Sequence, residues 1–399
     1  MTGPAPLLHQ PLRLLQVLEP SGGGSGRHFI DLCRGLKARG HVVHAVYSPR
    51  RAEERFVAEL SALALDGLHA VDMARSPGLS DIAARLRLGA IMHRHGPFDI
   101  VHGHSSKAGA LTRIRLPGRH VPRVYTPHAF RTMDPGLGRA GRLVYGTIET
   151  ALARFFTERL ICVSADEHAH ALSLGMPGDR LSIVTNGVET PPTGGREEIR
   201  NEFAIPAGAL VFGFVGRLSA QKAPERLVKA FSRIAGDLPH AHLLMVGAGE
   251  LEAEVRAMIA ASPHAGRMHL TSRQTGPQAL DAMDALVMPS RYEAMSYVML
   301  EAASAAKPLV LTDVGGASTV LTDGENGILV PNDDDAGALA AAMLELSQPL
   351  RLRHFRQAAT VRRGNYSLRR MVAETEAVYR GLAVDQVTIE PALLQGVSA

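Results

Sequence analysis

Four charged residues in the second half of the chain have the types and the spacing to bind a ligand that carries both phosphates and hydroxyls. Glu293 and Glu301 are separated by seven residues and follow an apolar run at 285–288. Arg217 and Lys222 follow an earlier apolar run. A guanidinium fork and an ammonium neutralise a diphosphate, and carboxylates accept hydrogen bonds from the vicinal hydroxyls of a sugar or ribose. This combination indicates a nucleotide-sugar site.

Each pair is expected where a buried strand passes through a loop into a helix. The run 285–288 predicts a strand, and Glu301 lies in the helix that follows. Another strand is predicted at 209–215, after which Gly216 allows the chain to turn, and Gly247 stands in a similar turn. In an open parallel sheet such loops line the carboxyl edge, where helix N-termini favour anions.

The first half of the chain opens with a strand, a glycine-rich loop and a helix. Residues 12–18 predict the strand, and Gly23 and Gly24 in the loop allow the backbone to approach a ligand closely. The third glycine of a dinucleotide fingerprint is replaced by Arg27, so a nicotinamide enzyme ranks last among the candidates. Further helices are predicted at 27–39, 51–68 and 80–95.

Histidines mark the ends of two more predicted strands in the first half. A strand at 98–102 ends in His102, and His104 lies just after it. A strand at 121–125 is followed by His128. Side chains at the carboxyl edge of a sheet can line a cleft, and for His104 a purely structural hydrogen bond is an equal alternative. His102 and His104 are too closely spaced for a helical zinc pair, and no metal site is expected.

These motifs, in this order, resemble the retaining glycosyltransferases of family four, which have the GT-B fold. The resemblance rests on the E-x7-E pair, on Gly216-Arg217 followed by Lys222, and on Thr126-Pro127-His128. Motifs of this order extend over residues 12–380, which is nearly the whole chain. The T-P-H and S-R-Y-E-x-M patterns are similar to those of transferases that assemble capsules and exopolysaccharides.

The resemblance implies a role for each matching residue. Glu293 would contact hydroxyls of the transferred sugar, Glu301 the ribose, and the Arg217–Lys222 pair the diphosphate. The implied catalytic residues are His128, Arg217, Lys222 and Glu293. The implied donor-binding residues are Gly23, Gly24, Gly216, Arg217, Lys222, Gly247, Arg273, Glu293, Ala294, Met295, Ser296 and Glu301. Two positions depart from the family pattern, because Ala294 stands where glycine is usual and Thr319 where glutamate is usual.

The resemblance also implies an α/β fold with two Rossmann-like, doubly wound domains that face a cleft. Residues 1–190 are expected to form an acceptor-side domain and residues 196–367 a nucleotide-sugar domain, joined by a Pro- and Gly-rich linker. Residues 368–399 are expected to form a last helix that returns to the first domain, followed by a tail. A length of 399 residues accommodates this organisation.

Composition favours a cytoplasmic protein, with contact to the inner membrane leaflet as an option. Only two cysteines are present, no run is long enough to span a membrane, and the N-terminus lacks the pattern of a signal peptide. Residues 1–190 hold 23 Lys and Arg against 16 Asp and Glu, whereas 191–399 hold 20 against 23. A basic amphipathic helix is predicted at 135–156, and we favour a core-facing helix over a membrane-surface helix there.

We therefore expect a retaining transferase that moves a hexosyl unit from a nucleotide-diphosphate sugar to a glycan or polyprenyl-diphosphate-linked acceptor. Cationic side chains and helix N–H groups would neutralise the leaving diphosphate, with no metal or other cofactor and no nucleic-acid partner. The run 332–335 spells D-x-D, but we interpret it as a helix cap. Two alternatives remain: a catalytically silent sugar-nucleotide-binding partner of a polysaccharide complex, and a GT-B epimerase acting on UDP-N-acetylglucosamine.

Overall fold

The computed structural model describes residues 10–114, 120–134, 136–293 and 295–395. The chain divides into two compact units. Unit 1 comprises Met1–Thr185 together with Leu368–Ala399, and unit 2 comprises Asn186–Ser367. Each unit contains one parallel sheet with helices on both faces, so the predicted α/β fold of two Rossmann-like domains is confirmed.

Unit 1 is built on a seven-stranded sheet in which every neighbouring pair is parallel. The strand order is β3-β2-β1-β4-β5-β6-β7. Its strands are β1 (Arg13–Leu18), β2 (Val42–Tyr47), β3 (Gly67–Ala70), β4 (Ile100–His104), β5 (Arg123–Thr126), β6 (Arg159–Cys162) and β7 (Leu181–Ile183). Its α-helices are α1 (Gly23–Ala38), α2 (Glu54–Ala62), α3 (Ser80–His95), α4 (Ser105–Arg113), α5 (Arg139–Phe156), α6 (Ala165–Ser173) and α15 (Leu368–Gln395).

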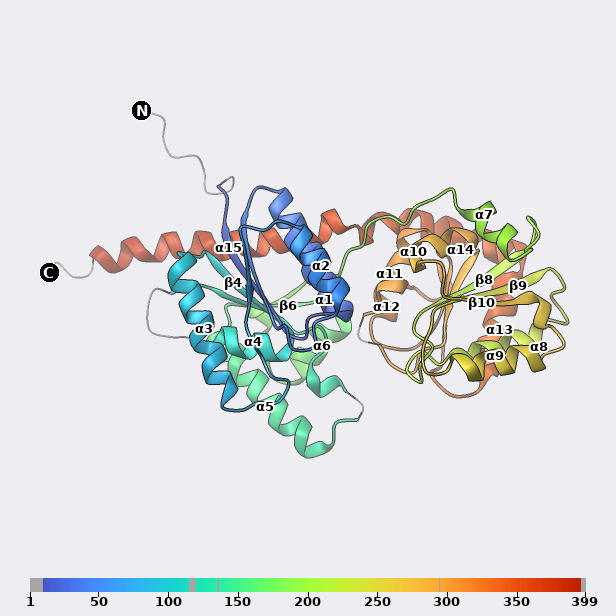
Figure 1. Cartoon of the computed structure of the whole chain (residues 1–399), viewed down its shortest axis with the longest axis horizontal. Helices are drawn as coiled ribbons and strands as arrows, with labels where there is room; N and C mark the ends of the chain where they lie inside the picture. The colour runs from blue at the N-terminus through green and yellow to red at the C-terminus, as the bar shows by residue number, and fades with distance from the viewer. Residues whose placement is uncertain (1–9, 115–119, 135, 294, 396–399) are drawn as a thin grey trace, which may run out of the picture. The chain divides into compact units, whose positions relative to one another are not determined.

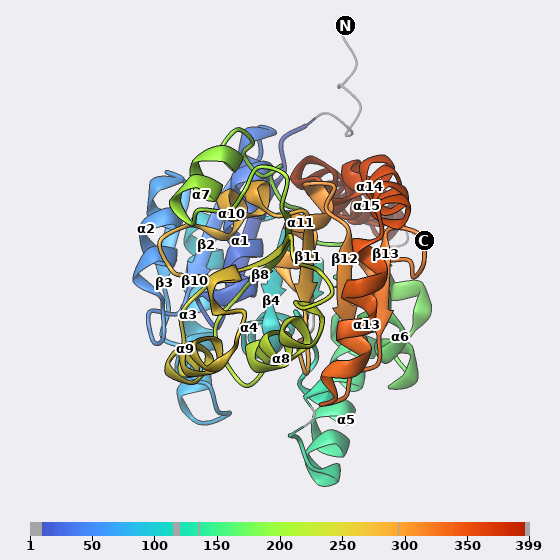
Figure 2. The same ribbon diagram turned by 90° about the vertical axis from the view of Figure 1, so that its right-hand side faces the viewer.

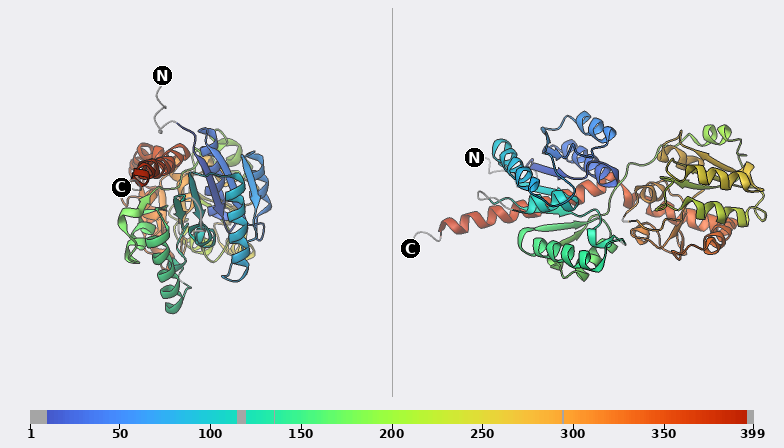
Figure 3. Two further views of the ribbon diagram at one scale, coloured as in Figure 1. Left: turned by 90° about the vertical axis from the view of Figure 1, so that its left-hand side faces the viewer. Right: turned by 60° about the horizontal axis from the view of Figure 1, so that its bottom comes forward.

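Helices cover both faces of this sheet (Figure 3). An apolar layer lies between the strands and the helices on each face. One layer joins the strands to α1 and α15, and the other joins them to α3 and α4. The contact between α1 and α15 is close (Figure 1), because a methyl group at Gly35 would lie 2.3 Å from Cγ2 of Val372. The last helix is therefore part of the core of unit 1.

One predicted helix in unit 1 is wrong over part of its length. The expected helix at 51–68 ends at Ala62, and the chain continues into the edge strand β3. Only four residues form β3, and their side chains are alternately half-buried and exposed. So short an edge strand gives little period-2 signal, and the register with β2 is what defines it.

Unit 2 is built on a six-stranded parallel sheet with the order β10-β9-β8-β11-β12-β13, which Figure 2 shows face on. Its strands are β8 (Leu210–Val215), β9 (Ala241–Val246), β10 (Met268–Thr271), β11 (Ala285–Met288), β12 (Leu309–Thr312) and β13 (Gly327–Val330). Its α-helices are α7 (Arg196–Glu202), α8 (Pro224–Ile234), α9 (Glu252–Ala261), α10 (Gly276–Ala282), α11 (Tyr297–Ser304), α12 (Ala317–Val320), α13 (Ala336–Ser347) and α14 (Pro349–Arg362).

The strands of unit 2 are continuous apolar runs because both of their faces are buried. All six residues of β8 and all six of β9 are buried. The helices α8 and α13 cover one face, whereas α10 and α11 cover the other. The predicted cap before α13 is confirmed, because the Asp335 side chain accepts a hydrogen bond from the Gly337 N–H.

Candidate functional site

The strand order of unit 2 predicts one crevice at the carboxyl edge of its sheet. The strands β8 and β11 are neighbours, and the chain winds away from them in opposite directions along the sheet. Loops that leave such neighbours part to opposite faces, and ligands of open α/β sheets bind at this switch point. The loop after β8 carries Gly216, Arg217 and Lys222, and the loop after β11 carries Glu293, Met295 and Ser296.

An ion pair joins these two loops. Lys222 Nζ lies 2.5 Å from Glu293 Oε1, and only 16% and 7% of the two side chains are exposed. The Lys222 chain runs beside Gly216, where a methyl group would lie 3.7 Å from its Cδ. An ion pair this well shielded from solvent interacts more strongly than a surface pair.

Backbone hydrogen bonds fix the position of the same two loops. The Arg291 N–H donates to the Gln221 carbonyl at 2.8 Å, and Gln221 Nε2 donates to the Tyr292 carbonyl at 3.0 Å. Arg291 Nη1 also donates to the Ala220 carbonyl at 2.7 Å. The loop conformations therefore support each other, and the Lys222–Glu293 pair is held by more than its own attraction.

Gly247 completes this edge of the sheet by allowing the loops after β8 and β9 to touch. Its φ is +155°, and a methyl group there would lie 1.9 Å from the Gly216 carbonyl oxygen. Its N–H donates to the Thr271 carbonyl at 2.8 Å, at the end of β10. Only glycine fits this position.

The remaining predicted donor-site residues of unit 2 differ in exposure. Arg217 is exposed, whereas Glu301 is buried on α11, with a carboxylate oxygen 3.9 Å from where a methyl at Gly276 would lie. Ser296 is buried at the N-cap of α11, and Met295 packs on the core. Arg273 is 82% exposed and pairs with Glu202. It follows the edge strand β10, which β9 and β8 separate from β11. Ala294 lies outside the described residues.

Two buried hydroxyls at this edge make no hydrogen bond to the described residues. Within the described part of the chain, Ser290 Oγ after β11 and Thr319 Oγ1 on α12 have no hydrogen-bond partner. Buried polar atoms are normally satisfied, so each exception calls for an explanation. A ligand that occupies the crevice is one such explanation. Neither residue was singled out for this role in the sequence, although Thr319 stood out as a departure from the family pattern.

In unit 1, three histidines gather at the carboxyl edge of the sheet. His28 of α1, His104 of β4 and His128 after β5 offer nitrogen atoms that all lie within 4.8 Å of one another. The residues Gly23 and Gly24 begin the same helix α1, and the Gly23 N–H donates to Glu53 Oε1 at 3.1 Å. Burial lowers the pKa of both His104 and His128 well below the usual range, and neighbouring imidazoles lower it further. Both rings are therefore neutral at pH 7.

A chain of hydrogen bonds sets the tautomer of His128. Gln16 Oε1 can only accept, so the His104 Nε2–H donates to it at 3.0 Å. The other nitrogen of neutral His104, Nδ1, then accepts from the His128 Nε2–H at 3.2 Å. Among the residues that the structure describes, no group donates to His128 Nδ1, so its lone pair is free. A hydroxyl of a bound sugar can donate to that atom.

The same chain extends to the last helix. Gln16 Nε2 donates to the Tyr379 hydroxyl at 3.2 Å, and that hydroxyl bonds to His102 Nδ1 at 2.5 Å. His102 Nε2 in turn bonds to Thr126 Oγ1 at 2.8 Å. His102 is thus a structural residue. His104 also has a structural role, because each of its ring nitrogens makes a hydrogen bond within unit 1. Gln16, His28 and Tyr379 gave no signal in the sequence, because residues up to 363 positions apart meet only in the folded unit.

The turn that carries His128 is strained and is held by a buried carboxylate. His128 has a φ of +53° and Ala129 a φ of +77°, both in the left-handed region. Glu167 accepts from the Ala129 N–H and from the Val163 N–H, each at 2.7 Å. Burial raises the pKa of Glu167 to about 7, and the two N–H bonds oppose that rise. Glu167 therefore positions the His128 turn.

We expect Tyr379→Phe to lower the free energy of unfolding by about 1–3 kcal/mol, since it removes the hydroxyl that bonds to the buried atoms Gln16 Nε2 and His102 Nδ1. Urea denaturation measures this loss. The matched control is Tyr292→Phe, whose side chain is half exposed and should change stability by less than about 0.5 kcal/mol. Equal stability of both variants would show that the chain of hydrogen bonds is not formed.

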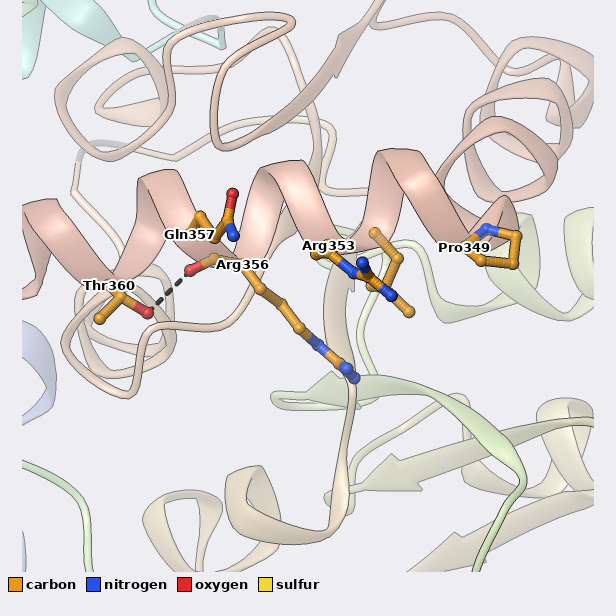
Figure 4. Close-up of a pocket in the computed structure, with 6 residues that line it drawn as sticks. Pro349, Arg353, Arg356, Gln357 and Thr360 are labelled. Carbon is orange, nitrogen blue, oxygen red and sulfur yellow. Dashed lines mark hydrogen bonds between the residues drawn. The ribbon is translucent and has the colours of Figure 1, made fainter.

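A separate hollow in unit 2 contains none of the predicted site residues. It has a volume of about 370 Å³ and lies along α14 (Figure 4). It is lined by Pro349, Leu352, Arg353, Arg356, Gln357 and Thr360. The loops after β8 and β11, rather than this hollow, carry the residues suited to a nucleotide sugar.

Comparison with known families identifies the chain. The family described as Glycosyltransferase Family 4 matches residues 22–192, and the family described as Glycosyl transferases group 1 matches residues 209–348. The chain belongs to the family 4 glycosyltransferases. Solved structures agree on its GT-B fold: a glycosyltransferase from Rickettsia africae ESF-5 has a TM-score of 0.76 at 19% identity, covering 93% of this chain and 98% of that one. HepE from Anabaena, in complex with UDP, also has a TM-score of 0.76, at 18% identity, covering 92% and 99%.

The names of related proteins indicate different acceptors. A UDP-Gal:alpha-D-GlcNAc-diphosphoundecaprenol alpha-1,3-galactosyltransferase of Escherichia coli is 29% identical over 59% of this chain and 63% of its own length. A D-inositol 3-phosphate glycosyltransferase of Jonesia denitrificans is 27% identical over 80% of this chain and 83% of its own length. The chain thus spans less than two thirds of the first of these relatives.

Proposed function

We propose that this protein transfers a hexosyl unit from a nucleotide-diphosphate sugar to a glycan or lipid-linked acceptor, with retention of configuration. The observation that carries the proposal is the Lys222–Glu293 pair at the switch point of unit 2. It combines a cation suited to a diphosphate with a carboxylate suited to sugar hydroxyls, on two loops that hold each other in place. The UDP and sugar bound in related structures of the fold are consistent with such a donor.

The proposed mechanism stabilises the leaving group. As the bond between the sugar and the diphosphate breaks, Lys222, Arg217 and the free N–H groups at the start of α11 stabilise the developing negative charge. A released phosphate oxygen accepts the proton of the acceptor hydroxyl, which attacks from the same face, so no carboxylate nucleophile is needed. His128 accepts a sugar hydroxyl on Nδ1. No metal or other cofactor takes part in this scheme.

A screen of nucleotide sugars tests the proposal. The protein is mixed with UDP, GDP and ADP sugars, thermal shifts identify the donor, and mass spectrometry follows that donor with and without lipid-linked acceptors. Acceptor-dependent transfer of the sugar with release of the nucleoside diphosphate supports the proposal. Binding without hydrolysis or transfer would instead favour a silent sugar-nucleotide-binding partner. Interconversion of the donor without acceptor would favour an epimerase.

We further propose that the acceptor is a polyprenyl-diphosphate-linked glycan, used in cell-surface polysaccharide synthesis at the cytoplasmic side of the inner membrane. The support is the name of the Escherichia coli relative, which acts on a diphosphoundecaprenol-linked sugar. Within the described residues no helix is long and apolar enough to cross a membrane. An enzyme with such an acceptor must reach the membrane surface, where the diphosphate of the acceptor lies.

The helix α5 provides a surface suited to that approach. The preferred core-facing interpretation of its apolar face is wrong, because Leu143, Val144, Ile148 and Phe155 are 49–72% exposed. The residues of α5 that are buried are Gly146, Glu149 and Ala153. Its single acidic residue is thus turned inward, where it pairs with Arg113 at 2.7 Å. The exposed face combines large apolar side chains with Arg139, Arg142 and Arg154, which is typical of helices that lie on anionic lipid.

Replacing Leu143 and Ile148 together with glutamate is expected to abolish binding to vesicles that contain anionic lipid. The substitution removes buried apolar contact with the lipid and adds two repelled charges. Co-sedimentation with phosphatidylglycerol vesicles measures the effect. The control is a glutamate pair at Leu350 and Val361 of α14, which are also highly exposed. Equal loss in both variants, or no binding by the wild type, would contradict a role for α5.

A further inference from the structure

A second histidine cluster in unit 1 lies away from the strand ends that carry His104 and His128. His44 of β2, His69 of β3 and His95 at the end of α3 offer ring nitrogens that all lie within 4.8 Å of one another. His44 Nδ1 and His69 Nε2 are already 3.2 Å apart. Three imidazoles from three different elements converge on one point, although their positions in the chain span 51 residues with no recognisable motif.

The backbone leaves space for this convergence. Gly67 is the Cα partner of His44 across the β2–β3 pair. A methyl group there would lie 2.1 Å from His44 Nδ1 and 2.8 Å from His69 Nε2. Any other residue at Gly67 would therefore occupy the place where the two nitrogens meet. The glycine keeps open the position from which both rings can bind a shared ligand.

The protonation state of His44 and His69 suits a metal ion rather than a proton. Burial lowers the pKa of His44 to about 4 and also lowers the pKa of His69, and the neighbouring imidazoles lower both further. The guanidinium of Arg13 acts in the same direction at His44, and Asp66 opposes it. At pH 7 both rings are neutral, which is the form that coordinates metals. Binding therefore releases no net proton, but the ring that donates in the His44–His69 hydrogen bond must carry its proton on its other nitrogen.

Access and coordination geometry are also favourable. His44 is buried, whereas His69 and His95 are half-buried, so an ion can enter from solvent on their side. Tetrahedral zinc with Zn–N bonds near 2.05 Å holds its nitrogens about 3.3 Å apart, close to the His44–His69 distance. His95 must approach by at most about 1.5 Å, a small movement for a side chain at the end of a helix. A water molecule would take the fourth position.

The two other histidine clusters of the described chain are less suited to a metal ion. In the His28–His104–His128 group, both ring nitrogens of His104 are already used in the bonds to Gln16 and His128. In unit 2, His242 and His269 form a similar pair at 3.1 Å on neighbouring strands, but no third ligand joins them.

We propose that His44, His69 and His95 form a binding site for a divalent transition-metal ion, with zinc as the natural occupant of a site made of three imidazoles. The bound ion ties the edge strand β3 to β2 and to the end of α3. Four-residue β3 otherwise has a neighbour only on one side, so the expected consequence is a more stable unit 1. This site is independent of the proposed glycosyl transfer.

Zinc titration of untagged, chelator-treated protein tests the site. We expect isothermal titration calorimetry at pH 7.5 to show one zinc site per chain, and zinc to raise the melting temperature. His69→Ala and His95→Ala should each weaken zinc binding at least tenfold and remove the thermal shift. These two half-buried residues are preferred over buried His44 because their loss disturbs the core less, and two variants protect the test against one that fails to fold.

Two controls make the test specific. His269→Ala removes one member of the two-histidine pair in unit 2 and should leave zinc binding unchanged. His28→Ala removes a member of the other triad and should also leave it unchanged. Absence of zinc binding at micromolar concentration would overturn the proposal. So would unaltered binding in His69→Ala and His95→Ala, or a loss of binding in His28→Ala.

Discussion

Lys222→Ala is expected to lower the turnover of the protein by two or more orders of magnitude. The lysine is the shielded cation of the switch-point crevice, and removal of one preorganised charge from a reacting centre typically costs this much. The measurement is the rate of nucleoside diphosphate release with the donor identified by the screen. Lys229→Ala, which removes an exposed lysine of the adjacent helix α8, is the matched control and should retain activity.

A loss of activity could also arise because the substitution damages the fold. Without Lys222, the Glu293 carboxylate is left buried and unpaired, which can cost about 3–5 kcal/mol. The double variant Lys222→Ala with Glu293→Gln removes that unpaired charge and should regain most of the stability. It should not regain turnover, because the cation that faces the diphosphate is still missing. Turnover within a few-fold of wild type in Lys222→Ala would refute the assigned role.

Asp284→Ala is expected to destabilise unit 2 by about 3–5 kcal/mol, since it breaks a buried network of charges. The Asp284 carboxylate, 6% exposed, accepts from Arg196, Arg200 and Arg356 at 2.6–2.9 Å and from the Val211 N–H at 2.8 Å. It thereby joins α7, α14 and β8 just before β11 begins. Arg356, on α14 (Figure 4), is half exposed, but Arg200 is buried and would be left without its carboxylate.

Hydrogen exchange of the β8 and β11 amides, together with urea denaturation, measures this loss in unit 2. The control Asp237→Ala changes an exposed turn residue and should shift stability by less than about 0.5 kcal/mol. If Asp284→Ala were as stable as this control, the network would contribute nothing to the fold.

The pH dependence of the same pair of proteins provides a second readout. Burial by itself raises the pKa of Asp284, but hydrogen bonds from Arg196 and the Val211 N–H, with the arginine charges, outweigh it and lower the pKa overall. A lowered folded-state pKa means that the stabilisation is complete above the unfolded value of about 3.9 and is lost as the pH falls through the folded value. The difference between wild type and Asp284→Ala should therefore stay constant from pH 7 to about pH 5 and shrink below about pH 4.

The sequence by itself determined the fold class and the family. Apolar runs followed by glycine and polar loops predicted the parallel strands, because strands buried on both faces are continuously apolar. The E-x7-E pair and the cations before it predicted a nucleotide-sugar site. Ligands of open α/β sheets bind at the carboxyl ends of the strands, so the side-chain types at those ends indicate the ligand even when their contacts are not known. The catalytic and donor roles of individual residues remain predictions.

The tertiary structure decided what depends on packing between distant segments. It paired Lys222 with Glu293, joined His128 to Tyr379 through Gln16, and turned the apolar face of α5 outward. It also placed Gly67 and Leu68 on a strand where a helix was predicted. The hydrophobic period and the composition of a sequence show only that one face of a helix or strand is apolar, or that a side chain can titrate. Which groups meet, and which face solvent, follows from strand order and register, because these bring together residues that the sequence separates.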